Sequence, residues 1–248
     1  MIRKYNSYED DFVTSCKQDL KLKDNYKWIH NNALYIIISY ILYWIIFVIA
    51  FIYSKFILKV KVRNKNVLKK YKSYYLYGNH TQEIGDIFDI PLITLPNRPY
   101  YICSPANLGI PILGKLLPFI GALPIPNSIN KMKEFKDAIH IRDKNHPIII
   151  YPEAHVWPYC TFIRDFPNTS FHFPVESNKP VFVMTRIYKK KKKKLKIEIV
   201  IDGPFNIKED LSKKENIQYL RDIVYETMVK RSKESNYEYI KYIKMEKE

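Results

Sequence analysis

The longest apolar stretch of the chain lies near its start. Residues 33–53 read ALYIIISYILYWIIFVIAFIY and contain no charge. A helix of this length rises about 30 Å, the thickness of the hydrocarbon core of a bilayer, and Tyr35 and Tyr53 fall where interfacial aromatic residues gather. The pattern predicts a membrane helix over about residues 33–53, within an N-terminal segment 1–57. A buried core helix and a helix lying in the membrane plane would show the same pattern.

Charges beside this stretch predict its orientation. After it, the chain up to Tyr75 has no acidic residue and eight basic ones: Lys55, Lys59, Lys61, Arg63, Lys65, Lys69, Lys70 and Lys72. Before it, basic and acidic residues nearly balance. Because basic flanks stay inside, the rest of the chain is expected on the cytoplasmic face of the cell membrane.

Beyond residue 57, short β-rich apolar runs alternate with longer mixed segments. Strands are predicted at 59–63, 73–78, 100–104, 122–126, 147–152, 180–188 and 195–201. Helices are predicted within 84–95, 112–120 and 130–142, and in the last third, where one face carries Ile217, Leu220, Val224 and Met228. This alternation predicts an α/β domain over 58–248, with a mostly parallel sheet and helices on both faces.

The composition and net charge indicate which kind of molecule the protein binds. Hydrophobic residues make up 47% of the chain, enough for a sizeable core, and the net charge of +16 suits an anionic partner. No zinc finger, RNP or helix-turn-helix signature occurs, so nucleic acid is not expected. The six lysines 189–194 lie between two predicted strands. They predict a solvated hairpin tip that attracts an anionic membrane surface.

Cysteine and histidine spacing disfavours metal and disulfide chemistry. Cys16, Cys103 and Cys160 form no CxxC pair, and the six histidines form no HxH or HExxH pattern. Reduced thiols and no metal site are therefore expected. A Cys160 nucleophile near His155 is conceivable but lacks a recognisable context, and GxSxG, P-loop and GxGxxG motifs are absent.

Polar residues follow two predicted strands, at the sheet edge where α/β proteins bind ligands. His80 follows the strand ending at Gly78, and Glu153 follows PIIIYP. A histidine can take a proton from a hydroxyl when a carboxylate orients its ring; Asp86 and Asp89 are both candidates. Alternatively, His80 caps the next helix and both aspartates are solvated on its first turn.

These residues resemble the motifs of the glycerolipid acyltransferase superfamily, whose bacterial members include PlsC-like lysophosphatidate acyltransferases. The likeness runs from GNHTQEIGD through PILGKLLPFIGALPIP and YPEAH to ESNKPVFVMTRIY. Departures accompany it: Asp86 lies one residue later than the family's spacing, and Pro126 replaces an arginine. In the third motif, Ala154 and His155 replace glycine and threonine.

The resemblance implies a membrane-bound O-acyltransferase. It would move a fatty acyl group from acyl-CoA or acyl-carrier protein to the hydroxyl of a lysophospholipid such as lysophosphatidate, without a metal or bound cofactor. His80 would be the general base and Asp86 its orienting partner. The implied substrate-binding residues are Asn79, Thr81, Glu153, His155, Lys115 and Arg164, with Arg186 another possible source of charge for the acceptor phosphate.

Two other functions fit parts of the sequence. A non-catalytic, acyltransferase-like lipid-binding protein would explain the displaced aspartate and the missing arginine. A membrane-anchored nucleic-acid-binding protein rests on the basic charge alone.

Overall fold

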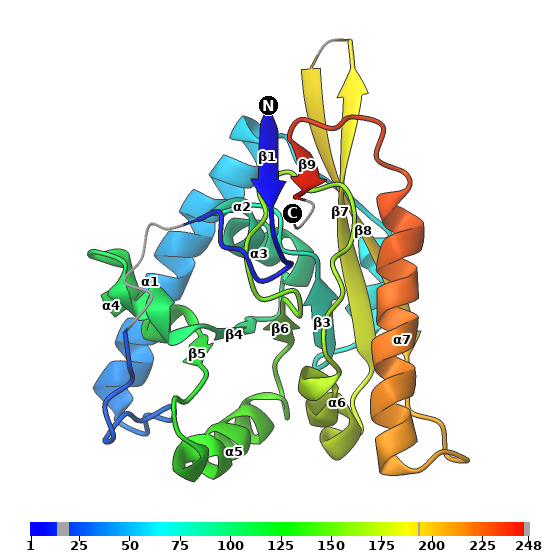
Figure 1. Ribbon diagram of the computed structural model, residues 1–248. Coiled ribbons are helices and arrows are strands. Elements are labelled where there is room, and N and C mark those ends of the chain that lie inside the picture. The colour runs from blue at the N-terminus through cyan, green and yellow to red at the C-terminus, as the bar shows by residue number, and fades with distance from the viewer. Residues whose placement is uncertain (14–19, 193, 246–248) are drawn as a thin grey trace.

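A seven-stranded sheet forms the centre of the molecule (Figure 1). The computed structural model describes residues 1–13, 20–192 and 194–245; Cys16 and Lys193 therefore lie outside the described residues. The strand order is β2-β8-β7-β3-β6-β4-β5. The strands are β2 (Lys61–Arg63), β3 (Tyr75–Gly78), β4 (Tyr100–Cys103), β5 (Ala122–Pro124), β6 (Ile148–Ile150), β7 (Val181–Lys191) and β8 (Lys194–Phe205).

The predicted mostly parallel α/β sheet is confirmed. Strands β7, β3, β6, β4 and β5 run parallel, whereas β8 is antiparallel to β7 and carries β2 parallel to itself. The reversal arises because β7 ends at Lys191 and β8 begins at Lys194, and so short a connection permits only antiparallel pairing. The predicted lysine-rich tip lies at this end of the two strands.

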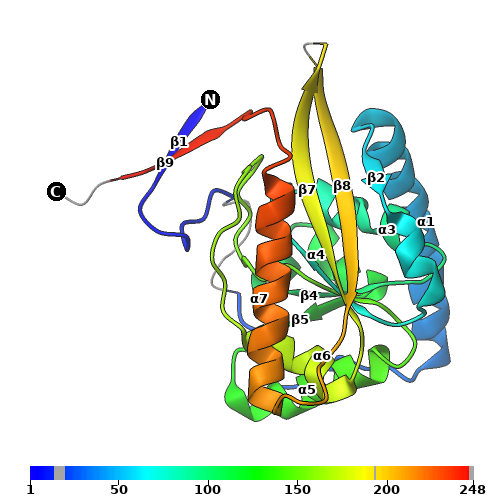
Figure 2. The same cartoon turned by 90° about the vertical axis from the view of Figure 1, so that its right-hand side faces the viewer.

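Helices cover both faces of the sheet. One face packs against α5 (Met132–Arg142), α6 (His172–Ser177) and α7 (Lys213–Ser232), and the other against α2 (Gly85–Phe88) and α3 (Ile90–Thr94). Figure 2 shows α7 and α1 on opposite sides of the β7–β8 hairpin. Central strands read as unbroken apolar runs because both faces are buried: Tyr75 and Tyr77 face one layer, and Leu76 the other.

Prolines divide two of the predicted helices. Residues 84–95 form the short helices α2 and α3, with Pro91 in the first turn of α3. Residues 112–120 form α4 (Leu113–Leu116) and a 3-10 turn (Leu117–Ile120) that contains Pro118. Proline has no N–H to donate and clashes with the preceding turn, so a continuous helix is interrupted.

The apolar N-terminal stretch forms α1 (Ala33–Ile52) and a π-helical turn (Tyr53–Ile57). Within the described residues it is the one helix long and apolar enough to cross a membrane, judged by length and composition. It lies lengthwise on the α/β domain: the rings of Tyr35 and Phe119 are 4.6 Å apart near its start, and those of Tyr53 and Phe88 are 5.6 Å apart near its end. A fully buried core helix is excluded, because an apolar stripe stays exposed: Leu34, Ile37, Ile41, Trp44, Ile45, Val48, Ile49 and Ile52.

The two ends of the chain meet in a feature that the sequence did not predict. Strands β1 (Ile2–Tyr5) and β9 (Lys241–Lys244) pair in parallel. Tyr5 and Tyr242 pack on Trp157, with ring centroids 4.8 Å away in both cases. Residues 1–57 therefore contact the domain at both α1 and β1, and β1 covers the loop that follows β6.

Candidate active site

The site lies at the carboxyl edge of the parallel strands, where β3 and β6 end beside the middle of β7. His80 follows β3 and Glu153 follows β6, 73 residues later. The carboxyl ends of parallel neighbours share one edge, and the Glu153 carboxylate accepts the His80 backbone N–H at 2.9 Å. Gly78 permits this crowding, because a Cβ atom there would lie 2.4 Å from Met184 and 2.9 Å from Tyr151.

A histidine–carboxylate pair forms the centre of the site. His80 Nδ1 lies 2.7 Å from Asp86 Oδ2. The same oxygen accepts the backbone N–H groups of Thr81 at 2.8 Å and Gln82 at 2.9 Å, which closes the turn between the two residues. This turn accommodates the extra residue before Asp86, so the structure selects Asp86 and not Asp89 as the partner of His80. The aspartates are fully buried, not solvated.

Arg186 in β7 joins both aspartates. Its Nη2 atom lies 2.8 Å from Asp86 Oδ1, and its Nη1 atom lies 2.9 Å from Asp89 Oδ2. Although burial opposes its charge, the two carboxylates raise the pKa of Arg186 above its usual value. The guanidinium is buried and already paired, so it does not present a free charge to a substrate phosphate.

Two predicted substrate-binding side chains hold β7 in place. Asn79 accepts the Arg186 backbone N–H at 2.7 Å and donates to the Arg186 carbonyl at 3.1 Å. Thr81 is fully buried and its hydroxyl accepts a hydrogen bond from Tyr188 at 2.9 Å. Both side chains thus tie the loop after β3 to the neighbouring strand.

Glu153 and Arg164 form a buried ion pair beneath the loop. Arg164 Nη2 lies 3.1 Å from Glu153 Oε2, and both side chains are 1% exposed. Glu153 Oε1 also accepts the Arg164 backbone N–H at 2.9 Å. Since Glu153 Oε2 holds the His80 backbone, the pair fixes the position of the histidine.

The other predicted substrate-binding residues lie farther from this network. The His155 side chain is 37% exposed and its Nδ1 lies 4.0 Å from Asp11. Lys115 is exposed on α4, which packs towards α1 through Leu113 and Ile46. Within the part of the chain that the structure describes, Lys115 is not brought into the contacts around His80.

Tyr151 belongs to the site although sequence reasoning missed it. Its ring stacks on His80 with centroids 4.5 Å apart, and its hydroxyl donates to the Asp86 carbonyl at 2.5 Å. Burial raises the pKa of Tyr151 well above its usual value, so the hydroxyl stays protonated. The available signal was its place directly before the Pro-Glu pair of YPEAH.

Two other kinds of site find no support at this edge. Cys160 is 1% exposed and donates to the Phe162 carbonyl, and burial raises its pKa to about 12, so it is not an activated nucleophile. Across residues 1–13, 20–192 and 194–245, no group of three or more His, Cys, Asp or Glu side chains is arranged to hold a metal ion.

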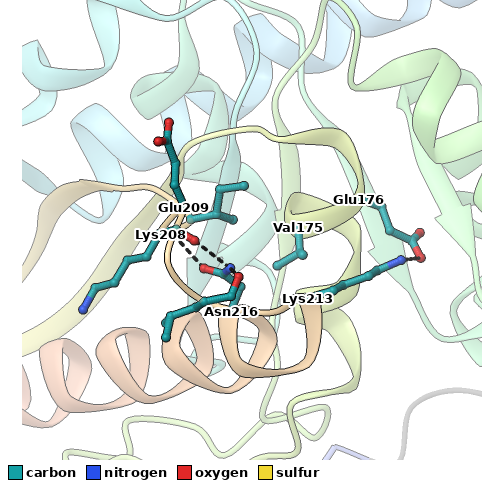
Figure 3. A pocket seen from close by; sticks show the side chains of 8 residues that line it. Val175, Glu176, Lys208, Glu209, Lys213 and Asn216 are labelled. Carbon is teal, nitrogen blue, oxygen red and sulfur yellow. Dashed lines mark hydrogen bonds and ion pairs between the residues drawn. The ribbon is translucent and has the colours of Figure 1, made fainter.

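A separate hollow lies away from this edge. It measures about 400 Å³ and is lined by Val175 and Glu176 of α6 and by Ile207, Lys208, Glu209, Leu211, Lys213 and Asn216 (Figure 3). Because α6 leads into the start of β7, the hollow lies at the amino end of the strands, opposite His80. Its Lys213 pairs with Glu176 at 2.8 Å, and it is not part of the site described above.

Comparison with known proteins places the fold. No protein-family model and no curated protein matches the sequence. The crystal structure of the 1-acyl-sn-glycerophosphate (LPA) acyltransferase PlsC from Thermotoga maritima is similar, with a TM-score of 0.52 and 16% sequence identity. The match covers 81% of this chain and 98% of that one. At this identity the likeness shows that the two chains share a fold.

Proposed function

We propose that the protein is an O-acyltransferase that moves a fatty acyl group from acyl-CoA or acyl-carrier protein to the hydroxyl of a lysophospholipid. The observation that carries this proposal is the 2.7 Å pair of His80 and Asp86 at the carboxyl edge of the sheet. Its support is the fold shared with PlsC, a 1-acyl-sn-glycerophosphate acyltransferase.

The proposed reaction uses His80 as the general base. Asp86 holds the proton on Nδ1, so Nε2 is free to take a proton from the acceptor hydroxyl. The acceptor oxygen attacks the thioester carbonyl, the new C–O bond forms, and the C–S bond breaks. The leaving thiolate then receives the proton from Nε2, and Asp86 stabilises the imidazolium in between.

The surroundings of the pair support this role. Only one ring nitrogen of His80 faces Asp86, and the side chain of His80 is 19% exposed while that of Asp86 is fully buried. A substrate can therefore reach the histidine but not its partner. Tyr151 and Glu153 hold the ring and the backbone from the β6 side, which is the preorganisation that general-base catalysis needs.

We infer that α1 lies in the surface of the membrane, with its apolar stripe embedded. Because α1 packs lengthwise on the domain, a crossing helix would draw the domain into the bilayer, whereas an in-plane helix does not. Tyr53 at its end contacts Phe88 of α2, two residues from Asp86. A lipid acceptor then approaches His80 from the bilayer. Lys55 and Lys59 follow the helix and favour the anionic, cytoplasmic leaflet.

Product analysis tests the proposal. The full chain, purified in detergent, is incubated with acyl-CoA or acylated carrier protein and a panel of lysophospholipids, and the lipids are identified by mass spectrometry. We expect one lysophospholipid to gain one acyl chain, with one thiol released per product. Phosphatidate, whose glycerol hydroxyls are both acylated, serves as the control, and no thiol should be released in its presence. Lipid binding without any product, with either donor, would favour the non-catalytic lipid-binding protein instead.

A further inference from the structure

Arg186 lies between two carboxylates, although the histidine needs only one. Asp86 and Asp89 are fully buried and the Arg186 side chain is 4% exposed, so water screens none of the three charges well. Asp86 Oδ2 serves His80 and two backbone amides, and Arg186 meets only the other oxygen, Oδ1. The arginine therefore fixes the plane of the carboxylate without competing for the atom that binds the ring.

A cation so close to Asp86 opposes the positive charge that His80 gains during catalysis. Asp89, 2.9 Å from the same guanidinium, offsets that effect. Together the three side chains carry one net negative charge, the same as Asp86 alone. Burial raises the pKa of Asp89, whereas Arg186 and the hydroxyl of Ser54 act in the opposite direction. The 2.9 Å ion pair with Arg186 opposes this rise and favours the charged form of Asp89.

We propose that Arg186 and Asp89 are positioning residues that set the basicity of His80: the arginine fixes the Asp86 carboxylate, and Asp89 compensates the charge of the arginine. The effect of these residues on the rate of acyl transfer rests on the proposed function. Their effect on the pKa of His80 is independent of that function and can be measured without substrate.

The other side chains around His80 keep their charge state when Asp89 or Arg186 is replaced. Among the residues that the structure describes, the other titratable and charged side chains that face His80 or its partners are Tyr151, Glu153, Arg164 and Tyr188. Glu153 and Arg164 neutralise each other at 3.1 Å. Burial raises the pKa of Tyr151 and Tyr188, which keeps both neutral. None of them changes charge near neutral pH in step with Asp89 or Arg186.

The experiment follows the titration of His80 by NMR in the full chain, labelled with ¹⁵N-histidine and held in detergent, with His80→Gln to assign the signal. Asp89→Asn removes a negative charge at nearly constant volume and should lower the pKa of His80 by about one unit. Arg186→Gln removes the positive charge and should raise it by a similar amount. The double variant restores the net charge and should return the pKa close to that of the wild type. Asp202→Asn is the control, because it removes the charge of another ion pair, with Arg231 at 2.6 Å; it should leave His80 unchanged.

The proposal is supported if the pKa of His80 shifts in opposite directions in the two single variants and recovers in the double variant. A purely structural defect would not shift the pKa in opposite directions. An unchanged pKa in Asp89→Asn, or shifts of the same sign, overturns the proposal. If Arg186→Gln does not fold, the shift of the His80 pKa in Asp89→Asn by itself tests the proposal. If these pKa shifts are seen but no acyl group is transferred, the proposed function is refuted. The charge coupling between Asp89, Arg186 and His80 would still hold.

Discussion

His80 Nδ1 and Asp86 Oδ2 lie 2.7 Å apart even though five residues separate them in the chain. The contact is made because the turn between them folds back on Asp86, whose Oδ2 also accepts the amides of Thr81 and Gln82. A carboxylate held by three donors and buried on α2 has little freedom to leave the ring. This local closure holds the ring of His80 against Asp86, and the proposed general-base role rests on that contact.

Asp86→Asn tests the orienting role. The amide cannot stabilise the imidazolium, so we expect the turnover rate for acyl transfer to fall about a hundredfold or more. Asp137→Asn, which changes an exposed aspartate of α5, should have no effect. Steady-state rates of thiol release decide the matter, and equal rates in the two variants would contradict the role of Asp86.

Glu153→Gln tests the buried pair beneath the loop. It leaves Arg164 as an uncompensated charge, and breaking a buried ion pair typically costs about 3–5 kcal/mol. We therefore expect a clear loss of thermal stability, accompanied by reduced activity because Glu153 holds the His80 backbone. Glu134→Gln removes an exposed partner of Lys131 and is the matched control. Similar melting temperatures for both variants would show that Arg164 is neutralised by other groups.

The exposed stripe of α1 predicts membrane binding. Ile41 and Ile45 are 55% and 52% exposed, and replacing both with lysine should release most of the protein from anionic vesicles in a flotation assay, since each charge is costly in hydrocarbon. Ile141→Lys is the control, because this isoleucine is 47% exposed on α5. Equal loss of binding in Ile141→Lys would mean that general surface charge, and not α1, determines attachment.

The reactivity of the thiols of Cys103 and Cys160 is predicted to depend on pH. Burial raises the pKa of both Cys103 and Cys160 to about 12. The folded state therefore favours the neutral thiol, and the reactive thiolate forms only as pH rises towards that value. In a Cys16→Ser background, neither thiol should react quickly with Ellman's reagent at about pH 8, whereas unfolded protein should react at both. Rapid reaction of either thiol in folded protein would contradict its raised pKa, and for Cys160 also its burial.

Sequence patterns predicted the sheet and the central pair because both depend on local order. Apolar runs such as residues 148–150 mark buried strands, and the place of His80 directly after β3 marks the carboxyl edge. Long-range geometry was not visible: the pairing of β1 with β9 joins opposite ends of the chain through short, partly polar strands. Nor could spacing show that Arg186, 100 residues after Asp86, points at two carboxylates, or that Arg164 is buried against Glu153.

The central claim is that His80 removes a proton from a lipid hydroxyl. Acceptor-dependent thiol release, measured with wild-type protein and with His80→Gln at equal concentrations, tests it most directly. We predict that release in the wild type requires the lysophospholipid and that the variant falls to the rate without acceptor. Acceptor-dependent release that persists in His80→Gln would contradict the claim, because another group would then activate the hydroxyl.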